Sequence, residues 1–211
     1  MMLEKCKYVR CIFVDFSKAF DVVDHRILID KLVALNVPNF IVGWIKSFLT
    51  GRSHATKFNG KLSPTATINQ SIVQGSGLGP VLFIMFVYDL ITLDDVNYLM
   101  KYADDMTLLN PENAKTSAET EMKNILGWAT RNKMIVNMLK TKEMVFHRPN
   151  PRQFICTSNL DEVERVNSFK LLGVYFKPDL SFSDHVSRLL TICNQRLYLL
   201  TQLNSKSKES V

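Results

Sequence analysis

Residues 98–109 constrain the fold more than any other stretch, because two adjacent aspartates stand between two apolar segments. The flanking aromatic and aliphatic residues predict two short strands joined by a tight turn at Asp104 and Asp105. Side chains alternate between the two faces of a strand, so neighbouring carboxylates converge only where the backbone turns. Two close negative charges need a cation or a proton as a partner. The pattern predicts a hairpin tip that binds a divalent metal, and hard oxygen ligands favour magnesium, or manganese in its place.

A third carboxylate closes a second apolar run, residues 8–16. The continuous apolar centre of this run predicts a strand buried on both faces, with Asp15 at its C-terminal end. If this strand lies beside the hairpin, three carboxylates meet at one sheet edge. Such a group can hold two magnesium ions about 4 Å apart for phosphoryl or nucleotidyl transfer. The alternatives are a solvated Asp-Asp turn and a helix cap formed by Asp15 or, more naturally, by Asp21.

A glycine-rich segment, residues 74–80, precedes an apolar helical pattern that runs to Leu90. Glycines permit close backbone approach to a ligand, and Pro80 suits the first turn of a helix. A loop that leads into a helix N-terminus favours phosphate. On spacing alone, a flexible connector explains the segment equally well.

Taken together, the segments resemble the reverse transcriptases of non-LTR (LINE-type) retrotransposons over nearly the whole chain. Five motifs occur in the order found in that family: FVDFSKAFD (13–21) with DH (24–25), QGSGLGP (74–80), YADD (102–105), NMLKT (137–141) with MVF (144–146), and LLGV (171–174). The resemblance implies an α+β polymerase palm, with a ferredoxin-like, mainly antiparallel sheet backed by helices. Residues 1–178 would form the palm, and residues 179–211 a partial thumb helix with a polar tail.

The resemblance also implies roles for single residues. Asp15 and Asp104 would be the principal ligands of two Mg²⁺ ions, with Mn²⁺ as a substitute, and Asp105 would complete the catalytic carboxylates. The implied nucleotide-binding residues are Phe16, Phe20, Gln74, Gly75 and Lys140.

Two of these implied roles are specific. The Phe20 ring would clash with a ribose 2′-hydroxyl and favour deoxynucleotides, although an ordinary core aromatic fits the pattern as well. Lys140 would assist the departure of pyrophosphate. Leu172 and Gly173 would form the primer grip, with Gly173 in the turn of a hairpin.

The sequence departs from the family pattern at Gly77, Tyr88 and Leu171, none of which is a predicted metal ligand. The family also has a fingers region before its first motif, which here begins at residue 13. The expectation is therefore a truncated copy of an element, or a part of a longer protein.

Composition is ordinary for one globular domain, with 46% hydrophobic and 22% charged residues among 211. The net charge of +6 suits an acidic polymer, and six basic residues against one acid occupy residues 131–152. No apolar run is long enough to span a bilayer and no secretory signal is evident, which favours an intracellular protein of the cytoplasm or nucleus. The four cysteines lack paired metal spacing and are predicted to be buried thiols.

Periodicity predicts the remaining elements. One helix carries Leu28, Leu32 and Leu35, and a second helix begins at Asn39 as its cap and ends at Gly51. Its apolar stripe is predicted to face the core rather than to stack on bases: Ile41, Trp44, Ile45, Phe48 and Leu49. Residues 53–59 and 65–72 are expected to pair around residues 60–64.

In the second half, residues 116–119 resemble a capping box for a helix with Met122, Ile125 and Ala129 facing inward. Strands are expected at 142–148 and 153–157. A last helix from Ser183 to about Leu203 has one apolar stripe, made of Val186, Leu189, Leu190, Cys193 and Leu197.

The leading functional hypothesis is an RNA-directed DNA polymerase that uses an RNA template, a DNA primer and deoxynucleoside triphosphates. The alternative is a catalytically inactive remnant that still binds nucleic acid. A third possibility is a marginally folded fragment without a function, since loss of the fingers would expose an apolar flank.

Overall fold

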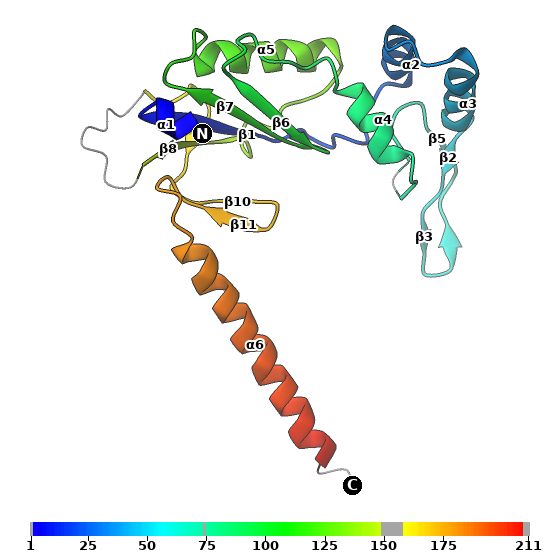
Figure 1. Cartoon of the computed structure of the whole chain (residues 1–211). Coiled ribbons are helices and arrows are strands. Elements are labelled where there is room, and N and C mark those ends of the chain that lie inside the picture. Colours follow the sequence, from blue (N-terminus) through cyan, green and yellow to red (C-terminus); the bar gives the residue numbers. More distant parts are fainter. Residues whose placement is uncertain (1, 74, 149–157, 209–211) are drawn as a thin grey trace.

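The computed structural model describes residues 2–73, 75–148 and 158–208, with side chains described to residue 203. Its centre is a five-stranded sheet in the order β6-β7-β1-β8-β9, mainly antiparallel, with a parallel pair between β8 and β9 (Figure 1). The strands are β1 (Tyr8–Val14), β6 (Tyr98–Tyr102), β7 (Asp105–Pro111), β8 (Lys142–His147) and β9 (Glu164–Arg165). The predicted α+β fold with an antiparallel sheet and helical backing is confirmed.

Helices cover one face of this sheet, with α5 lying across it and α2, α3 and α4 grouped beside it (Figure 1). The helices are α1 (Met2–Lys5), α2 (His25–Ala34), α3 (Asn39–Leu49), α4 (Gly79–Phe86), α5 (Ala118–Arg131) and α6 (Ser183–Lys208). The main core lies between the sheet and the helices and includes Ile12, Leu28, Phe83, Leu108 and Ile125. The apolar centre of β1 is therefore buried from both sides, as its sequence predicts.

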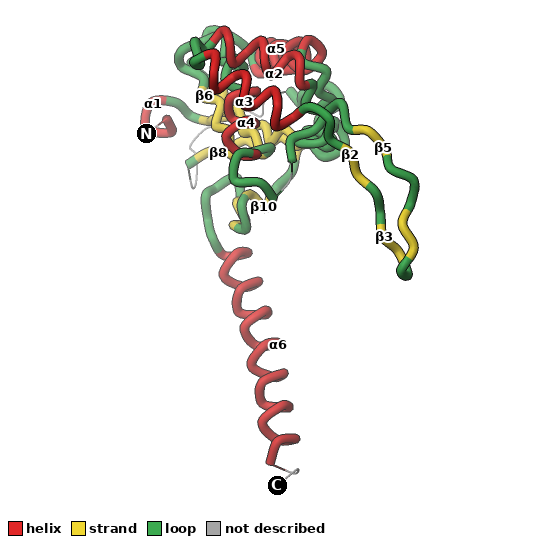
Figure 2. Tube along the Cα trace, turned by 90° about the vertical axis from the view of Figure 1, so that its right-hand side faces the viewer, coloured by secondary structure: helices red, strands yellow, loops and turns green. Residues whose placement is uncertain are grey.

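The opposite face of the sheet carries a smaller apolar cluster around Cys11, Phe13 and Met144. A separate hairpin, β10 (Phe169–Leu171) and β11 (Val174–Phe176), packs against this cluster. The helix α6 follows this hairpin and projects from the rest of the fold (Figures 1 and 2). None of the described helices is long and apolar enough to cross a membrane.

A two-part hairpin, which we call the arm, projects beside α3 (Figure 2). Two short ladders build it, β2 (Ser53–His54) with β5 (Ala66–Thr67) and β3 (Lys57–Phe58) with β4 (Lys61–Leu62). The predicted pairing is confirmed, but the predicted connection at residues 60–64 is wrong. The chain turns at Asn59 and Gly60, both with positive φ, because this pair suits a tight two-residue turn.

Three predicted helix caps are shifted. Asp24, not Asp21, caps α2, since its side chain accepts bonds from the backbone N–H groups of Arg26 and Ile27. Pro38 precedes α3, so Asn39 is its first helical residue. Ser117, one residue later than expected, caps α5. Each shift is within two or three residues, where several polar residues compete for the capping position.

One predicted apolar stripe faces the core except at one residue, and the other does not face a core. On α3, Ile45 and Leu49 are buried, and Ile41 and Phe48 pack against the core, as predicted. Trp44 on α3 is 60% exposed, and Val42 is buried instead. The α6 stripe, residues 186–197, is exposed. Among the described residues the helix meets the β10–β11 hairpin only at its beginning, where Arg188 lies over the Tyr175 ring. Cys193, predicted to be buried, is exposed for the same reason, whereas Cys11 is buried as expected. The strand expected at 153–157 and Cys156 lie outside the described residues.

Candidate active site

Strand pairing brings the predicted catalytic carboxylates to one end of the sheet. β1 and β7 run antiparallel, with Val14 opposite Met106, so Asp15 follows β1 where Asp105 begins β7. On the other side of β7, Tyr102 pairs with Asp105 and closes a two-residue turn that contains Asp104. The predicted adjacency of the first strand and the hairpin is confirmed.

The turn itself is held in an unusual conformation. Ala103 has φ of 52°, in the left-handed region that residues with a Cβ rarely adopt. Such backbone costs of order 1 kcal/mol or more and persists where the surrounding structure over-determines it. Here the surroundings are β6 and β7, which close the turn at Tyr102 and Asp105. The position of Asp104 is therefore fixed by backbone pairing.

The pKa of Asp105 is affected by burial and by the two neighbouring carboxylates. Partial burial, and then the negative charges of Asp104 and Asp15, raise the pKa of the Asp105 carboxyl above its usual value. The Lys140 ammonium lies 4.0 Å from an Asp15 oxygen, at the outer limit of an ion pair. The three carboxylates therefore carry more negative charge than the single Lys140 ammonium neutralises.

A metal site is not preassembled. Across the ranges that the structure describes, no three or more Asp, Glu, His or Cys side chains are grouped so that they could hold an ion. The sheet brings the three aspartates into one neighbourhood, but their side chains do not converge on one point. Their identity still suits a hard divalent cation, because all three offer carboxylate oxygens.

Backbone bonds link the loop after β1 to the glycine-rich segment. The Ile72 N–H donates to the Phe20 carbonyl at 2.9 Å, and the Ser71 N–H donates to the Val23 carbonyl at 2.9 Å. The Phe20 ring stacks on Phe83 of α4, with centroids 4.4 Å apart. Phe20 is therefore half-buried and fixed against the helix that follows the glycine-rich segment.

The other predicted nucleotide-binding residues are placed differently. Phe16 is buried in the main core, so its side chain does not face a ligand. Gly75 is exposed with φ of 79°. Gln74 lies outside the described residues. Gly79 serves packing, since an added Cβ would lie 3.1 Å from the Val73 carbonyl oxygen.

The primer-grip candidate is the turn of the β10–β11 hairpin. Leu172 and Gly173 form this turn with φ of 47° and 88°. Both values are positive, as in a type I′ hairpin turn, and Gly173 suits this conformation without strain. The predicted hairpin turn at Gly173 is confirmed, and Leu172 is exposed at its tip.

The family follows from comparison with known proteins. Residues 2–176 match the family described as Reverse transcriptase (RNA-dependent DNA polymerase). The chain belongs to the reverse transcriptase family. Members of this family generally use divalent metal ions.

Curated relatives of this reverse transcriptase chain come from fly transposons. It is 28% identical over 97% of its length to a probable RNA-directed DNA polymerase from transposon X-element of Drosophila melanogaster. It is 29% identical over 89% of its length to the RNA-directed DNA polymerase from mobile element jockey of Drosophila funebris. The aligned regions cover 24% and 22% of those two proteins, so the chain spans less than a quarter of their length.

Solved structures support the fold alone. Telomerase from Candida tropicalis, without its C-terminal domain, aligns with a TM-score of 0.57 at 12% identity, covering 85% of this chain and 36% of that one. Telomerase of the same organism with the TWJ fragment of telomeric RNA aligns with a TM-score of 0.56 at 13% identity, covering 85% and 30%. The non-LTR reverse transcriptase resemblance of the motifs is therefore confirmed at the level of family and fold.

Two residues with a place in the reverse transcriptase site were not singled out by their sequence. The Thr141 hydroxyl accepts a bond from the Asp15 N–H at 3.3 Å, and the Asn137 N–H donates to the Asp15 carbonyl at 2.8 Å. Both belong to the fourth motif, which thus holds the Asp15 backbone from the side opposite the hairpin. A buried threonine beside a basic residue was the available signal, but only strand pairing shows what it contacts.

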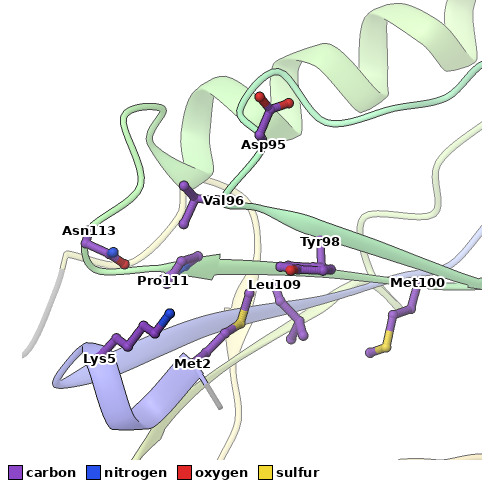
Figure 3. Close-up of a pocket in the computed structure, with 9 residues that line it drawn as sticks. All are labelled: Met2, Lys5, Asp95, Val96, Tyr98, Met100, Leu109, Pro111 and Asn113. Carbon is purple, nitrogen blue, oxygen red and sulfur yellow. The ribbon is translucent and has the colours of Figure 1, made fainter.

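Figure 3 shows a different pocket, of about 520 Å³, near the end of the β6–β7 hairpin away from its turn. Its lining comes from α1, β6, β7 and nearby loops: Met2, Lys5, Asp95, Val96, Tyr98, Met100, Leu109, Pro111 and Asn113. None of the predicted site residues lines this pocket. Asp95, one of the lining residues, is exposed.

Proposed function

We propose that this chain is the palm, with the start of a thumb, of an RNA-directed DNA polymerase of a non-LTR retrotransposon. One observation carries the proposal: the end of β1 and the β6–β7 turn bring Asp15, Asp104 and Asp105 together at one end of the sheet. Family membership supplies the chemistry that such a group performs. The chain would extend a DNA primer on an RNA template with deoxynucleoside triphosphates.

Asp15, Asp104 and Asp105 would hold two Mg²⁺ ions, or Mn²⁺ in their place. The raised pKa of Asp105 is consistent with this assignment, because partial burial and then the charges of Asp104 and Asp15 disfavour its ionised form, which a bound cation would stabilise. When bound, such ions lower the barrier to in-line transfer by neutralising charge on the attacking and leaving oxygens. Thr141 and Asn137 would keep Asp15 in place by holding its backbone.

The nucleotide would lie between the loop after β1 and the glycine-rich segment. The Phe20 ring, fixed by Phe83, would select against a ribose 2′-hydroxyl. Exposed Gly75 and, by the family resemblance, Gln74 would approach the nucleotide, and Phe16 would contribute through its backbone. Lys140, close to Asp15, would stabilise the departing pyrophosphate.

The Leu172–Gly173 turn would hold the primer end. Residues 1–178 would be the palm and residues 179–211 the beginning of a thumb, in keeping with the separation of α6 from the sheet (Figure 1). In this arrangement the catalytic carboxylates and the primer grip belong to two different hairpins.

A primer-extension assay with purified protein, Mg²⁺ or Mn²⁺, a DNA primer and an RNA template tests the proposal. Asp104→Asn removes a charge without changing shape, and should reduce incorporation by roughly a hundredfold or more. Asp95→Asn, which removes the same charge from an exposed loop residue, is the matched control and should leave incorporation unchanged. Equal incorporation by Asp104→Asn and the wild type would overturn the proposal.

A nucleic-acid-binding protein without catalysis is the second candidate. The observation in its favour is that no metal-binding group is preassembled in the described parts of the chain. Salt-dependent binding of RNA by a protein that incorporates no nucleotide with either metal would select it.

A further inference from the structure

Three aromatic rings form a stripe on α3, and two of them are exposed. Trp44 was expected to face the core but does not, whereas Phe48 is partly buried against the core. Phe40, Trp44 and Phe48 recur every four residues, so they lie on one side of the helix. Phe40 is 78% exposed and Trp44 is 60% exposed. We call these three rings, with Arg52 at their end, the aromatic stripe. Exposed rings in such a row are unusual on a surface that nothing covers.

The stripe is ordered by its own contacts. The Trp44 and Phe48 rings stack with centroids 6.3 Å apart and planes inclined by 26°. The Arg52 guanidinium lies over the Phe48 ring, 4.8 Å from its centroid. The rings are thus held as a platform with a cation at one end, and the outer faces of Phe40 and Trp44 remain open.

The segment that carries the stripe is basic, although two aspartates of neighbouring elements lie close to it. Asp21 lines a cavity together with Arg52, and Asp30 lines another together with Lys46. None of the twenty acidic residues of the chain lies within residues 31–88, a segment that includes α3, the arm and the glycine-rich loop. The segment carries five basic residues, of which Lys31 is buried against Asp89. The other four lie on α3 and the arm: Lys46, Arg52, Lys57 and Lys61. Two copies of this surface would repel each other, whereas a polyanion would be attracted.

One end of the stripe borders a cavity at the base of the arm. This cavity, of about 740 Å³, is lined by Arg52 and His54, by Asp21 of the loop after β1 and by His25, the first residue of α2. Val73, next to the predicted nucleotide-binding Gln74, also lines it. Arg52 therefore joins this cavity to the rings on α3. Figures 1 and 2 show α3 and the arm side by side at the edge of the fold.

We propose that the aromatic stripe binds an unpaired strand of nucleic acid, whose bases stack on Trp44 and Phe40 while Arg52 and the arm lysines contact its phosphates. Exposed aromatic rings combined with several basic residues are the features that sequence-tolerant single-strand binding uses. This inference rests on the proposed function, in which the strand would be the template outside the duplex. It adds a location on α3 and the arm for that strand.

Tryptophan fluorescence tests the proposal directly, because the chain has two tryptophans and only Trp44 is exposed, while Trp128 is 3% exposed. We expect single-stranded oligouridylate, added to the whole chain in EDTA without nucleotides, to quench the emission. The quenching should weaken as salt is raised, since phosphate contacts release counterions. Trp44→Leu should abolish the quenching, because the remaining tryptophan is buried. The same RNA in duplex form, whose bases are already stacked, should quench little.

Gly43→Glu provides a variant that spares the fold. Gly43 is exposed on α3 beside Trp44, and an added Cβ would meet nothing within 4 Å. Glutamate is the better helix former, so the helix should not weaken. Its charge beside the platform should reduce RNA affinity roughly tenfold or more. Thr120→Glu, an exposed site in the first turn of α5, adds the same charge away from the stripe and should leave affinity unchanged.

RNA binding without tryptophan quenching, and with equal affinity in Gly43→Glu, would overturn the proposal. So would self-association in sedimentation that Gly43→Glu abolishes while RNA binding persists, because a second copy would then cover the stripe. The outcome of this RNA-binding test does not depend on the outcome of the primer-extension assay. Asp104→Asn should quench normally with RNA, so absence of nucleotide incorporation leaves this inference standing, and loss of quenching leaves the polymerase proposal standing.

Discussion

Two hairpins of similar design are held in the molecule in different ways. Both β6–β7 and β10–β11 turn through two residues; Ala103 has positive φ in the first turn, and Leu172 and Gly173 both have positive φ in the second. In the first, β7 pairs with β1 over six residues, and Met106 and Leu108 enter the main core. The second pairs only with itself, over three residues, and touches the sheet through side chains, with Phe169 stacked on Phe13 at 3.9 Å.

The difference concerns how firmly each turn is positioned. A strand paired on both sides cannot move without breaking a ladder, so Asp104 and Asp105 are fixed relative to Asp15. The β10–β11 hairpin rests on rings above an apolar cavity of about 390 Å³, lined among others by Phe146, Leu171 and Phe176. Side-chain contacts of this kind allow small shifts at little cost. In the proposed function, the metal-binding turn is rigid and the primer-holding turn is adjustable.

The largest expected effect comes from the paired hairpin. Leu108→Ala removes a fully buried side chain of β7 and should lower the free energy of unfolding by about 2–5 kcal/mol, since a cavity remains. Urea unfolding measures the change. Leu139→Ala, at a site that is 87% exposed, should change it by less than about 0.5 kcal/mol. A small effect of Leu108→Ala would show that β7 is not part of the cooperative core.

A smaller and more local effect is expected at the second hairpin. Phe169→Ala removes the ring that stacks on Phe13 and should cost about 1–2 kcal/mol. Hydrogen exchange should show loss of amide protection in β10 and β11 while β6 and β7 stay protected, because the two hairpins share no ladder. Equal loss of protection in both would contradict the proposed difference in attachment.

Substitutions in the two turns should have opposite signs. Gly173→Ala places a Cβ at φ of 88° and should destabilise its hairpin by about 1 kcal/mol. Ala103→Gly relieves a residue at φ of 52° and should stabilise by up to about 1 kcal/mol. Thermal unfolding of both variants beside the wild type checks the signs. Destabilisation by Ala103→Gly would mean that the β6–β7 turn stores no backbone strain.

The smallest expected effect concerns Asp24, the cap of α2, which forms an ion pair with Lys133. The Lys133 ammonium, 2.6 Å from Asp24, lowers the pKa of the Asp24 carboxyl, and the N–H groups of Ile27 and Arg26 add to this. Because the folded pKa lies below the unfolded one, near 3.9, this contribution is present above pH 4 or so and is lost as pH falls through the folded value. We expect at most about 1 kcal/mol, since Lys133 is largely exposed.

Urea unfolding at a series of pH values between neutral and acidic measures how much the Asp24–Lys133 ion pair contributes to the free energy of unfolding. Asp24→Asn keeps a capping oxygen but has no charge to lose, so its stability should fall less steeply over that interval. Parallel curves for the variant and the wild type would show that the ion pair contributes nothing.

Local sequence patterns predicted the strand and the hairpin that carry the three aspartates, because strand alternation and turn chemistry depend on neighbouring residues. The apolar run before Asp15 predicted a buried strand, and the aspartate pair between two apolar segments predicted a hairpin. The turn lies one residue earlier than predicted, at Ala103 and Asp104, because Asp105 pairs with Tyr102 and begins β7. The order of five motifs then indicated the family. Helix starts were less well predicted, because Asp21 and Asp24, or Thr116 and Ser117, satisfy the same capping pattern. Geometry within one turn of helix decides between them.

The amino-acid sequence alone determined the elements, the acidic turn and the family of this reverse transcriptase chain, because alternation, helical period and turn chemistry act over a few residues. Only the tertiary structure decided what each apolar face meets. The α3 and α6 stripes have the period of core helices, yet Trp44 and Leu197 face solvent, whereas Thr141 reaches Asp15 from far along the chain. Periodicity states that a face is apolar, but burial depends on which distant segments pack against it.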